Sequence, residues 1–303
     1  MLDKKKSITI DVPLVRKLIS DQFPKWKDLS IKPVALGGWD NRTFHLGKKM
    51  LVRLPSANCY TDQVEKEHQH LPKLSQALPL SIPTPLGVGE PSKAYPWKWS
   101  IYSWISGEDA ASTPIENLCV LSRELAQFLT TLYQIDPTNG PLPGSHNFHR
   151  GGALYTYDSQ VRQALVILKD RVDTHLIAQV WEEALASTWS FPPVWIHGDI
   201  SAGNLLIEKG KLKAVIDFGM MAIGDPACDL AIAWAFFKGE SRRLFQQELS
   251  IDSDTWRRAC GWALWKALII AADFTSNPRG TVSPWTIIED ILEDRRLEEG
   301  KEI

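Results

Sequence analysis

The chain has few of the features that mark secreted or nucleic-acid-binding proteins. Its four cysteines are widely spaced and form no CxxC pair: Cys59, Cys119, Cys228 and Cys260. This spacing argues against a zinc site and against a disulfide framework. The formal net charge of the 303 residues is only −2, so nothing in the composition indicates a nucleic-acid partner.

Long apolar runs are also missing. The N-terminal stretch MLDKKKSITIDVP lacks the apolar core of a signal peptide. The most apolar later segment, Gly261 to Ala272, is too short to span a bilayer and contains Lys266. With 44% apolar residues and 23% charged residues, the composition is typical of a globular protein. We therefore expect a cytoplasmic protein with reduced thiols and no membrane partner.

The pattern of apolar residues predicts an α+β protein of two lobes, since the chain is long for one compact unit. The first third is β-rich. We predict a helix capped by Asp11, a loop at residues 79–89, and strands from Ile31 to Pro55 and from Trp97 to Ile105. Helical spacing dominates the remainder: Leu118–Ile135, Tyr157–Leu168, Leu176–Ser187, Asp229–Lys238, Ser241–Leu249, Thr255–Thr275 and the final WTIIEDILEDRRLEE. The predicted domains are residues 1–105 and 106–303.

Polar residues interrupt two apolar runs, WIHGDISAGNLLI at 195–207 and AVIDFG at 214–219. The segments NLLIE and KLKAVIDFG predict a hairpin around Lys209 and Gly210. A hairpin brings its two ends together, so Asn204 and Asp217 are expected to be neighbours, with Asp199 close by. Two oxygen ligands side by side suit Mg²⁺, and a third carboxylate that holds no metal can accept a proton from a hydroxyl group.

This spacing is typical of phosphoryl transfer: a base Asp, an Asn five residues on, and the Asp of a D-F-G sequence. The simpler alternative is that Asp199 caps a turn and Asp217 ends a strand. Two spacings and the hairpin geometry together favour the catalytic interpretation. With GDPACDLA at 224–231, these segments resemble the aminoglycoside phosphotransferase family of small-molecule kinases.

The resemblance implies a two-lobed, protein-kinase-like fold with a small β-rich N-lobe and a larger helical C-lobe. It also implies ATP or GTP as phosphate donor, with Mg²⁺, in the cleft. Asp199 would be the catalytic residue, and Asn204 and Asp217 the metal ligands. Gly37 and Gly38 would cover the phosphates. Arg53 stands where the family has lysine, and Glu67 would be its ion-pair partner.

Other residues are assigned from the same resemblance. The segment SIYSWISGE would form the hinge, with Ser103, Trp104 and Ile105 near the nucleotide base. His197 is expected to make a structural hydrogen bond rather than to act as an acid or base. Asp229 is expected to give structural support, and capping of the helix that follows is the preferred explanation for it.

The acceptor is expected to be a hydroxyl group of a small molecule such as an aminoglycoside, a macrolide or a related metabolite. Only four residues separate Gly219 from Gly224, which leaves no room for the activation segment of a protein kinase. The acidic residues of the last helix could attract a polyamine, or could form a solvated face: Glu289, Asp290, Glu293 and Asp294. The tryptophans of the second half could form an aromatic acceptor wall, or could be core: Trp234, Trp256, Trp262, Trp265 and Trp285.

Two other functions are compatible with parts of this pattern. Arg53 in the lysine position favours a nucleotide-binding, pseudokinase-like protein without transferase activity, but such a protein has no use for Asp199, Asn204 and Asp217 together. A metal-dependent phosphohydrolase built on His197 would need further histidine or carboxylate ligands at metal spacing. A nucleotide- and Mg²⁺-dependent O-phosphotransferase is therefore the predicted function.

Overall fold

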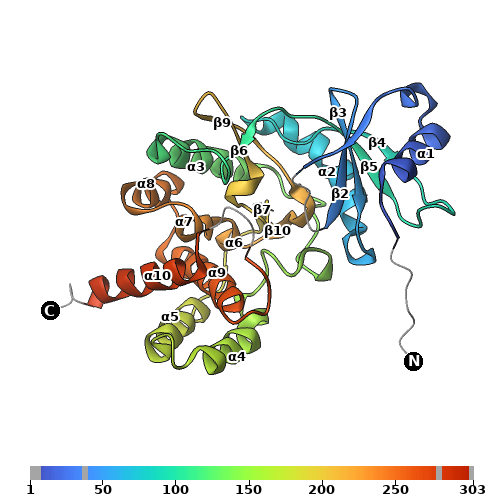
Figure 1. The fold of residues 1–303 in the computed structure, drawn as a ribbon. Helices are drawn as coiled ribbons and strands as arrows, with labels where there is room; N and C mark the ends of the chain where they lie inside the picture. Colours follow the sequence, from blue (N-terminus) through green and yellow to red (C-terminus); the bar gives the residue numbers. More distant parts are fainter. Residues whose placement is uncertain (1–7, 36–39, 278–281, 300–303) are drawn as a thin grey trace, which may run out of the picture. The chain divides into compact units, whose positions relative to one another are not determined.

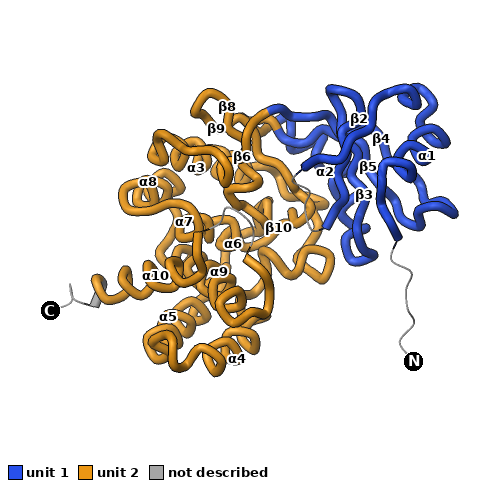
Figure 2. The backbone as a smooth tube through the Cα atoms, in the orientation of Figure 1, with its two compact units in different colours: residues 1–76, 82–106 blue, residues 77–81, 107–303 orange. Residues whose placement is uncertain are grey.

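The structure is a computed structural model that describes residues 8–35, 40–277 and 282–299 (Figure 1). The chain forms two compact units (Figure 2). Unit 1 comprises residues 1–76 and 82–106, and unit 2 comprises residues 77–81 and 107–303. A five-stranded sheet dominates unit 1 and helices dominate unit 2, so the predicted α+β class is confirmed. That these units are domains bounded at residue 105 stays a prediction.

The sheet of unit 1 is antiparallel, with the strand order β1-β2-β3-β5-β4. Its strands are β1 (Ile31–Pro33), β2 (Asn41–Leu46), β3 (Met50–Pro55), β4 (Pro85–Gly89) and β5 (Trp99–Ser103). The predicted strands between Ile31 and Pro55 are confirmed. The predicted loop at 79–89 is wrong over its second half, because β4 forms the edge of the sheet beside β5. Proline and glycine are unusual in the interior of a sheet, so the sequence does not indicate this strand. An edge strand tolerates them because it pairs on one side only.

Two helices accompany this sheet, α1 (Val12–Gln22) and α2 (Asp62–Ala77). The carboxylate of Asp11 accepts a hydrogen bond from the Leu14 N–H at 2.9 Å, so the predicted N-cap of α1 is confirmed. The apolar face of α1 joins the core of the sheet through Val15, Leu18 and Ile19. Short 3₁₀ turns lie at Pro24–Trp26 and Asn58–Tyr60.

Unit 2 contains two small sheets. One holds the predicted hairpin, β8 (Leu205–Glu208) and β9 (Lys211–Val215), with β6 (Glu108–Asp109) beside it. Lys209 and Gly210 form the turn with φ of 53° and 75°, which is the left-handed geometry of a tight hairpin turn. The other sheet pairs β7 (Val194–Ile196) with β10 (Ala222–Gly224). The predicted hairpin is confirmed.

In unit 2, α9 packs against α4, α5, α6 and α10, and α3 packs against α8 (Figure 1). The helices of this unit are α3 (Leu118–Gln134), α4 (Asp158–Leu168), α5 (Thr174–Leu185), α6 (Ala227–Leu230), α7 (Ile232–Ala235), α8 (Gly239–Leu249), α9 (Ser253–Ala271) and α10 (Pro284–Glu299). The predicted helix Asp229–Lys238 is confirmed only in part, because the segment divides into the one-turn helices α6 and α7 and ends at Ala235. In the described part of the chain, no helix is both long and apolar enough to cross a membrane.

Candidate active site

The loop after β7 carries His197, Gly198 and Asp199. Gly198 has φ of 82°, and a Cβ atom there would lie 2.4 Å from the Met220 carbonyl oxygen, so only glycine fits. The His197 ring is fully buried. Its Nε2 lies 3.0 Å from the Ile216 carbonyl oxygen, and its Nδ1 accepts the Asp199 N–H at 3.2 Å. Both ring nitrogens therefore hold the backbone, which suits a structural rather than an acid–base task.

Asn204 links the loop to the hairpin. Its Nδ2 donates to the Asp199 carbonyl oxygen at 2.9 Å and to the Asp199 Oδ2 at 3.2 Å. The backbone carbonyl oxygen of Asn204 accepts the Ile216 N–H at 2.9 Å. Because Leu205 pairs with Val215 in the register of the hairpin, Asn204 lies opposite the residue that precedes Asp217. The hairpin thus gathers the predicted residues at one end.

Asp217 adopts a left-handed conformation with φ of 68° and precedes the 3₁₀ turn Phe218–Met220. A non-glycine residue in this region has an energetic cost of about 1 kcal/mol, so the surroundings must hold it there. The buried Phe218 ring packs on His197 with centroids 4.5 Å apart. Asn147 donates from Nδ2 to the Met220 carbonyl oxygen at 3.2 Å. Asn147 lies 73 residues from Met220 and in no motif, so the sequence did not indicate this contact.

Asp229 is fully buried, and its carboxylate binds the backbone of the loop after β7. Its Oδ2 accepts the His197 N–H at 2.9 Å, and its Oδ1 accepts the Gly198 N–H at 2.7 Å. The preferred explanation that Asp229 caps a helix is wrong, because Asp229 lies inside α6. Asp225 instead accepts the Ala227 N–H at 3.0 Å as α6 begins. Two backbone hydrogen bonds from a loop distant in sequence outweigh a local cap.

The charge of Asp229 should make stability depend on pH. Burial raises the pKa of Asp229 to about 6, although His197 and the two backbone N–H groups oppose this rise. Between pH 4 and 6 the folded chain then binds more protons than the unfolded chain, so the free energy of unfolding falls as pH rises. We expect wild type to lose about 2 to 3 kcal/mol relative to Asp229→Asn across this window. Urea unfolding of both proteins at each pH measures the difference, and parallel pH curves would contradict it.

In unit 1, Arg53 and Glu67 form the predicted pair. The Arg53 Nη1 lies 3.3 Å from the Glu67 Oε1, and the Arg53 Nη2 lies 3.8 Å from the Asp40 Oδ2. Glu67 is only 2% exposed and also accepts a hydrogen bond from the Tyr102 hydroxyl group. Burial, and then the Glu67 charge, raise the pKa of Tyr102 well above its usual range, so the hydroxyl remains a donor. Asp40 and Tyr102 were not among the predicted site residues, although alternation along β5 could have indicated Tyr102.

The predicted hinge residues differ in what their backbones can do. The Ser103 N–H donates to the Thr84 carbonyl oxygen at 2.9 Å, and the Trp104 N–H donates to the Lys49 carbonyl oxygen at 2.8 Å. Of the three predicted positions, Ile105 is the one whose N–H donates to no described atom. The Trp104 ring packs on His45 with centroids 4.3 Å apart. Gly37 and Gly38 lie outside the described residues.

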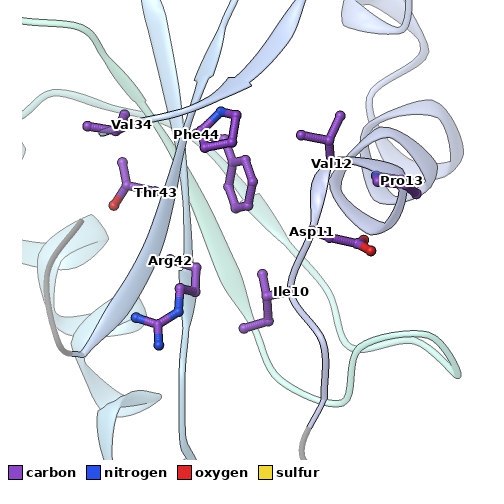
Figure 3. Close-up of a pocket in the computed structure, with 9 residues that line it drawn as sticks. Ile10, Asp11, Val12, Pro13, Val34, Arg42, Thr43 and Phe44 are labelled. Atoms are coloured by element: carbon purple, nitrogen blue, oxygen red, sulfur yellow. The ribbon is translucent and has the colours of Figure 1, made fainter. Parts of the chain in front are cut away.

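A surface hollow of unit 1 is lined by other residues (Figure 3). It is lined by Ile10, Asp11, Val12, Pro13, Pro33, Val34, Arg42, Thr43 and Phe44. None of the predicted nucleotide-binding residues belongs to this lining. The Asp11 carboxylate already caps α1, and most other lining side chains are apolar. The hollow therefore offers few polar groups to a nucleotide.

The two candidate acceptor features are largely occupied by structural contacts. On α10, Asp290 and Asp294 bind Arg242 with N–O distances of 2.7 and 2.8 Å. Three of the five tryptophans are buried core residues: Trp234, Trp262 and Trp265. Two of the four acidic side chains are thus held in ion pairs with Arg242. The tryptophans are mainly core, as the simpler alternative for them predicts.

Comparisons with known proteins agree with this geometry. The model of a family described as the phosphotransferase enzyme family matches residues 30–262. An aminoglycoside 3'-phosphotransferase of Salmonella typhimurium is 35% identical over 132 residues, which is 41% of this chain and 47% of the relative. Another from Escherichia coli is 46% identical over 57 residues, which is 18% of this chain and 21% of that relative. The chain thus spans about half, or less, of the length of these curated relatives.

Solved structures match over almost the whole chain. The GDP and kanamycin complex of APH(2")-IIia has a TM-score of 0.64 at 19% identity, and covers 95% of this chain and 99% of that one. The macrolide 2'-phosphotransferase MphH from Brachybacterium faecium has a TM-score of 0.61 at 18% identity, with coverages of 86% and 93%. At this identity the likeness shows the fold alone, and the predicted kinase-like fold is confirmed.

Proposed function

Because the chain belongs to the phosphotransferase enzyme family, we propose that it moves the γ-phosphoryl group of ATP or GTP to a hydroxyl group of a small molecule. One observation carries the proposal: the β8–β9 hairpin and the loop after β7 gather Asp199, Asn204 and Asp217, with Asn204 hydrogen-bonded to Asp199. A carboxylate base beside two hard oxygen ligands is the arrangement that phosphoryl transfer needs. We place this activity in the cytoplasm, where nucleoside triphosphates are available.

The donor set of unit 2 fits Mg²⁺. Both hydrogen bonds of the Asn204 amide use its nitrogen, so the carboxamide oxygen is the atom left for a cation. Together with the Asp217 carboxylate this makes two hard oxygen ligands, and phosphate oxygens and water complete the shell that Mg²⁺ prefers. When bound, the ion neutralises the charge that develops on the phosphates. Asp199 orients the acceptor hydroxyl and takes its proton.

Unit 1 supplies the groups proposed to bind the nucleotide. Arg53 grips phosphate oxygens with its planar guanidinium group, which keeps the charge of the usual lysine. Glu67 orients Arg53, and Tyr102 in turn holds Glu67. The Ile105 N–H is the hinge donor available to a base.

The first test of this function is thermal stability with ATP and with GTP, each with and without Mg²⁺. A nucleotide that binds only the folded state at a hundredfold excess over Kd adds about 2.7 kcal/mol of stability. We expect a Mg²⁺-dependent rise in Tm with at least one nucleotide, and a smaller rise for Arg53→Gln. An unchanged Tm with both nucleotides at millimolar concentration in the presence of Mg²⁺ would contradict the proposal.

A second candidate is a nucleotide-binding protein without transferase activity, and Arg53 in the usual lysine position favours it. The same preparation separates the two functions. Release of ADP or GDP that increases with a hydroxylated acceptor supports the transferase. A nucleotide-dependent rise in Tm with no release of diphosphate for any acceptor supports the binding protein.

A further inference from the structure

Two cationic side chains of unit 2 lie over the ring of the same tryptophan, Trp265. The Arg150 guanidinium carbon is 5.1 Å from the ring centroid of Trp265 and 5.2 Å from that of Trp262. The Lys266 Nζ is 5.9 Å from the centroid of Trp265. Tyr157 packs on the Trp265 ring with centroids 3.9 Å apart. These aromatic faces hold the two cations in one small region.

The surrounding structure fixes this region. The loop that carries Arg150 is pinned by Asn147, whose Nδ2 donates to the Arg150 carbonyl oxygen at 2.9 Å as well as to Met220. The next residue, Gly151, accepts the Asp225 N–H at 2.8 Å. Trp265 is held by the hydrogen bond from its Nε1 to the Gln160 Oε1 at 2.8 Å. Arg150 therefore comes from a loop that is hydrogen-bonded to the segment following Asp217.

The pair also lies within electrostatic reach of the proposed base. Burial lowers the pKa of Lys266, the Arg150 charge lowers it further, and the Asp199 carboxylate raises it. The Arg150 charge also lowers the pKa of the buried Asp229, against the larger effect of burial. The oxygens of Asp229 already accept the His197 and Gly198 N–H groups. The charge of Lys266 thus interacts with that of Asp199, and the charge of Arg150 with that of Asp229.

Neither cation has a carboxylate partner. Among the described residues, the Arg150 guanidinium group and the Lys266 ammonium group make no ion pair and no hydrogen bond. Other partly or fully buried arginines of unit 2 do pair, Arg242 with Asp290 at 2.7 Å and Arg258 with Asp225 at 2.7 Å. Two partly buried like charges without an ion-pair partner are unfavourable in the free protein, and a bound anion would relieve this.

We propose, on the basis of the proposed function, that the acceptor is an anionic hydroxyl compound whose carboxylate or phosphate group binds Arg150 and Lys266. The guanidinium fork of Arg150 matches the paired oxygens of either group, and Lys266 adds a second positive charge. The same two charges repel a polyamine such as an aminoglycoside. In the reaction, the bond from the γ-phosphorus to the bridging oxygen breaks and the bond to the acceptor oxygen forms. The hydroxyl proton passes to Asp199, and the nucleoside diphosphate leaves.

The test uses four probes with one carbon skeleton: glucose, glucosamine, gluconate and glucose 6-phosphate. Diphosphate release and acceptor-dependent rise in Tm are measured for each probe with the full chain, Mg²⁺ and the preferred nucleotide. We expect at least one of the two anions to exceed glucose in kcat/KM about tenfold to a hundredfold, the range for hydrogen bonds to charged groups. Glucosamine is expected to be the poorest acceptor. Preference for gluconate or for glucose 6-phosphate distinguishes a carboxylate from a phosphate.

Variants assign the preference to the two cations. Arg150→Gln and Lys266→Gln should each reduce the preference for the anion, mainly through KM, and Lys266→Arg should restore it. Arg257→Gln is the matched control, because Arg257 lies on α9 with Lys266, is exposed and pairs with Asp254. The nucleotide-dependent rise in Tm shows that each variant is folded.

Three outcomes would overturn the assignment: glucose or glucosamine used as well as the anions, an anion preference that survives both variants, or no anion that is either phosphorylated or raises Tm. Each of these differs from a failure of the proposed function, in which neither nucleotide raises Tm in the presence of Mg²⁺.

Discussion

Asp199→Asn is expected to lower kcat by about a hundredfold to ten-thousandfold, the contribution of a positioned general base. Asparagine keeps the size of the side chain but cannot take the proton of the acceptor hydroxyl. Its oxygen can still accept the hydrogen bond from the Asn204 Nδ2, which spans 3.2 Å to the Asp199 Oδ2. Binding of nucleotide should therefore persist while turnover is lost, as measured by diphosphate release alongside the nucleotide-dependent rise in Tm.

The control for this prediction is Asp170→Asn, an equivalent change at an exposed aspartate outside the site. It should leave both kcat and the rise in Tm unchanged. Near-normal turnover of Asp199→Asn would show that another group accepts the proton. Loss of the nucleotide-dependent rise together with turnover would instead assign Asp199 to nucleotide or metal binding.

Arg258→Met is expected to reduce the free energy of unfolding by about 3 to 5 kcal/mol, the effect of removing one partner of a buried ion pair. Arg258 is 4% exposed and Asp225 is 8% exposed, with Nε and Oδ2 2.7 Å apart. Arg258 also donates to the Ser187 Oγ at 2.8 Å and to the Thr255 Oγ1 at 3.0 Å. The substitution leaves the Asp225 carboxylate buried without its cation, and urea unfolding at pH 7 measures the loss.

Two further variants complete the test. Arg257→Met changes the neighbouring, exposed arginine and should alter the free energy of unfolding by only about 0.5 kcal/mol. The double variant Asp225→Asn with Arg258→Met should be more stable than Arg258→Met alone, because it removes the stranded charge. A cost below about 1 kcal/mol for Arg258→Met would mean that water reaches Asp225 when the arginine is removed.

The elements that local chemistry specifies were predictable. Asp11 caps α1 through a contact three residues away. Lys209 and Gly210 make the hairpin turn whatever surrounds it, since the turn needs only two residues that accept positive φ. The gathering of Asn204 and Asp217 follows from that hairpin, so the core of the candidate site could be inferred from spacing. Arg53 and Glu67 were paired through the family resemblance, and they meet with 3.3 Å between Nη1 and Oε1.

Contacts between distant residues could not be inferred in this way. The strand β4 contains proline and glycine, and it forms because β5 offers an edge to pair with. Asp229 looked like a helix cap, but it binds two N–H groups that lie 31 and 32 residues earlier. Arg150 and Lys266 meet around Trp265 although they belong to a loop and a helix far apart in the chain. Residue spacing encodes turns, caps and hairpins because these involve near neighbours, whereas the partner of a buried charge depends on which distant segments pack together.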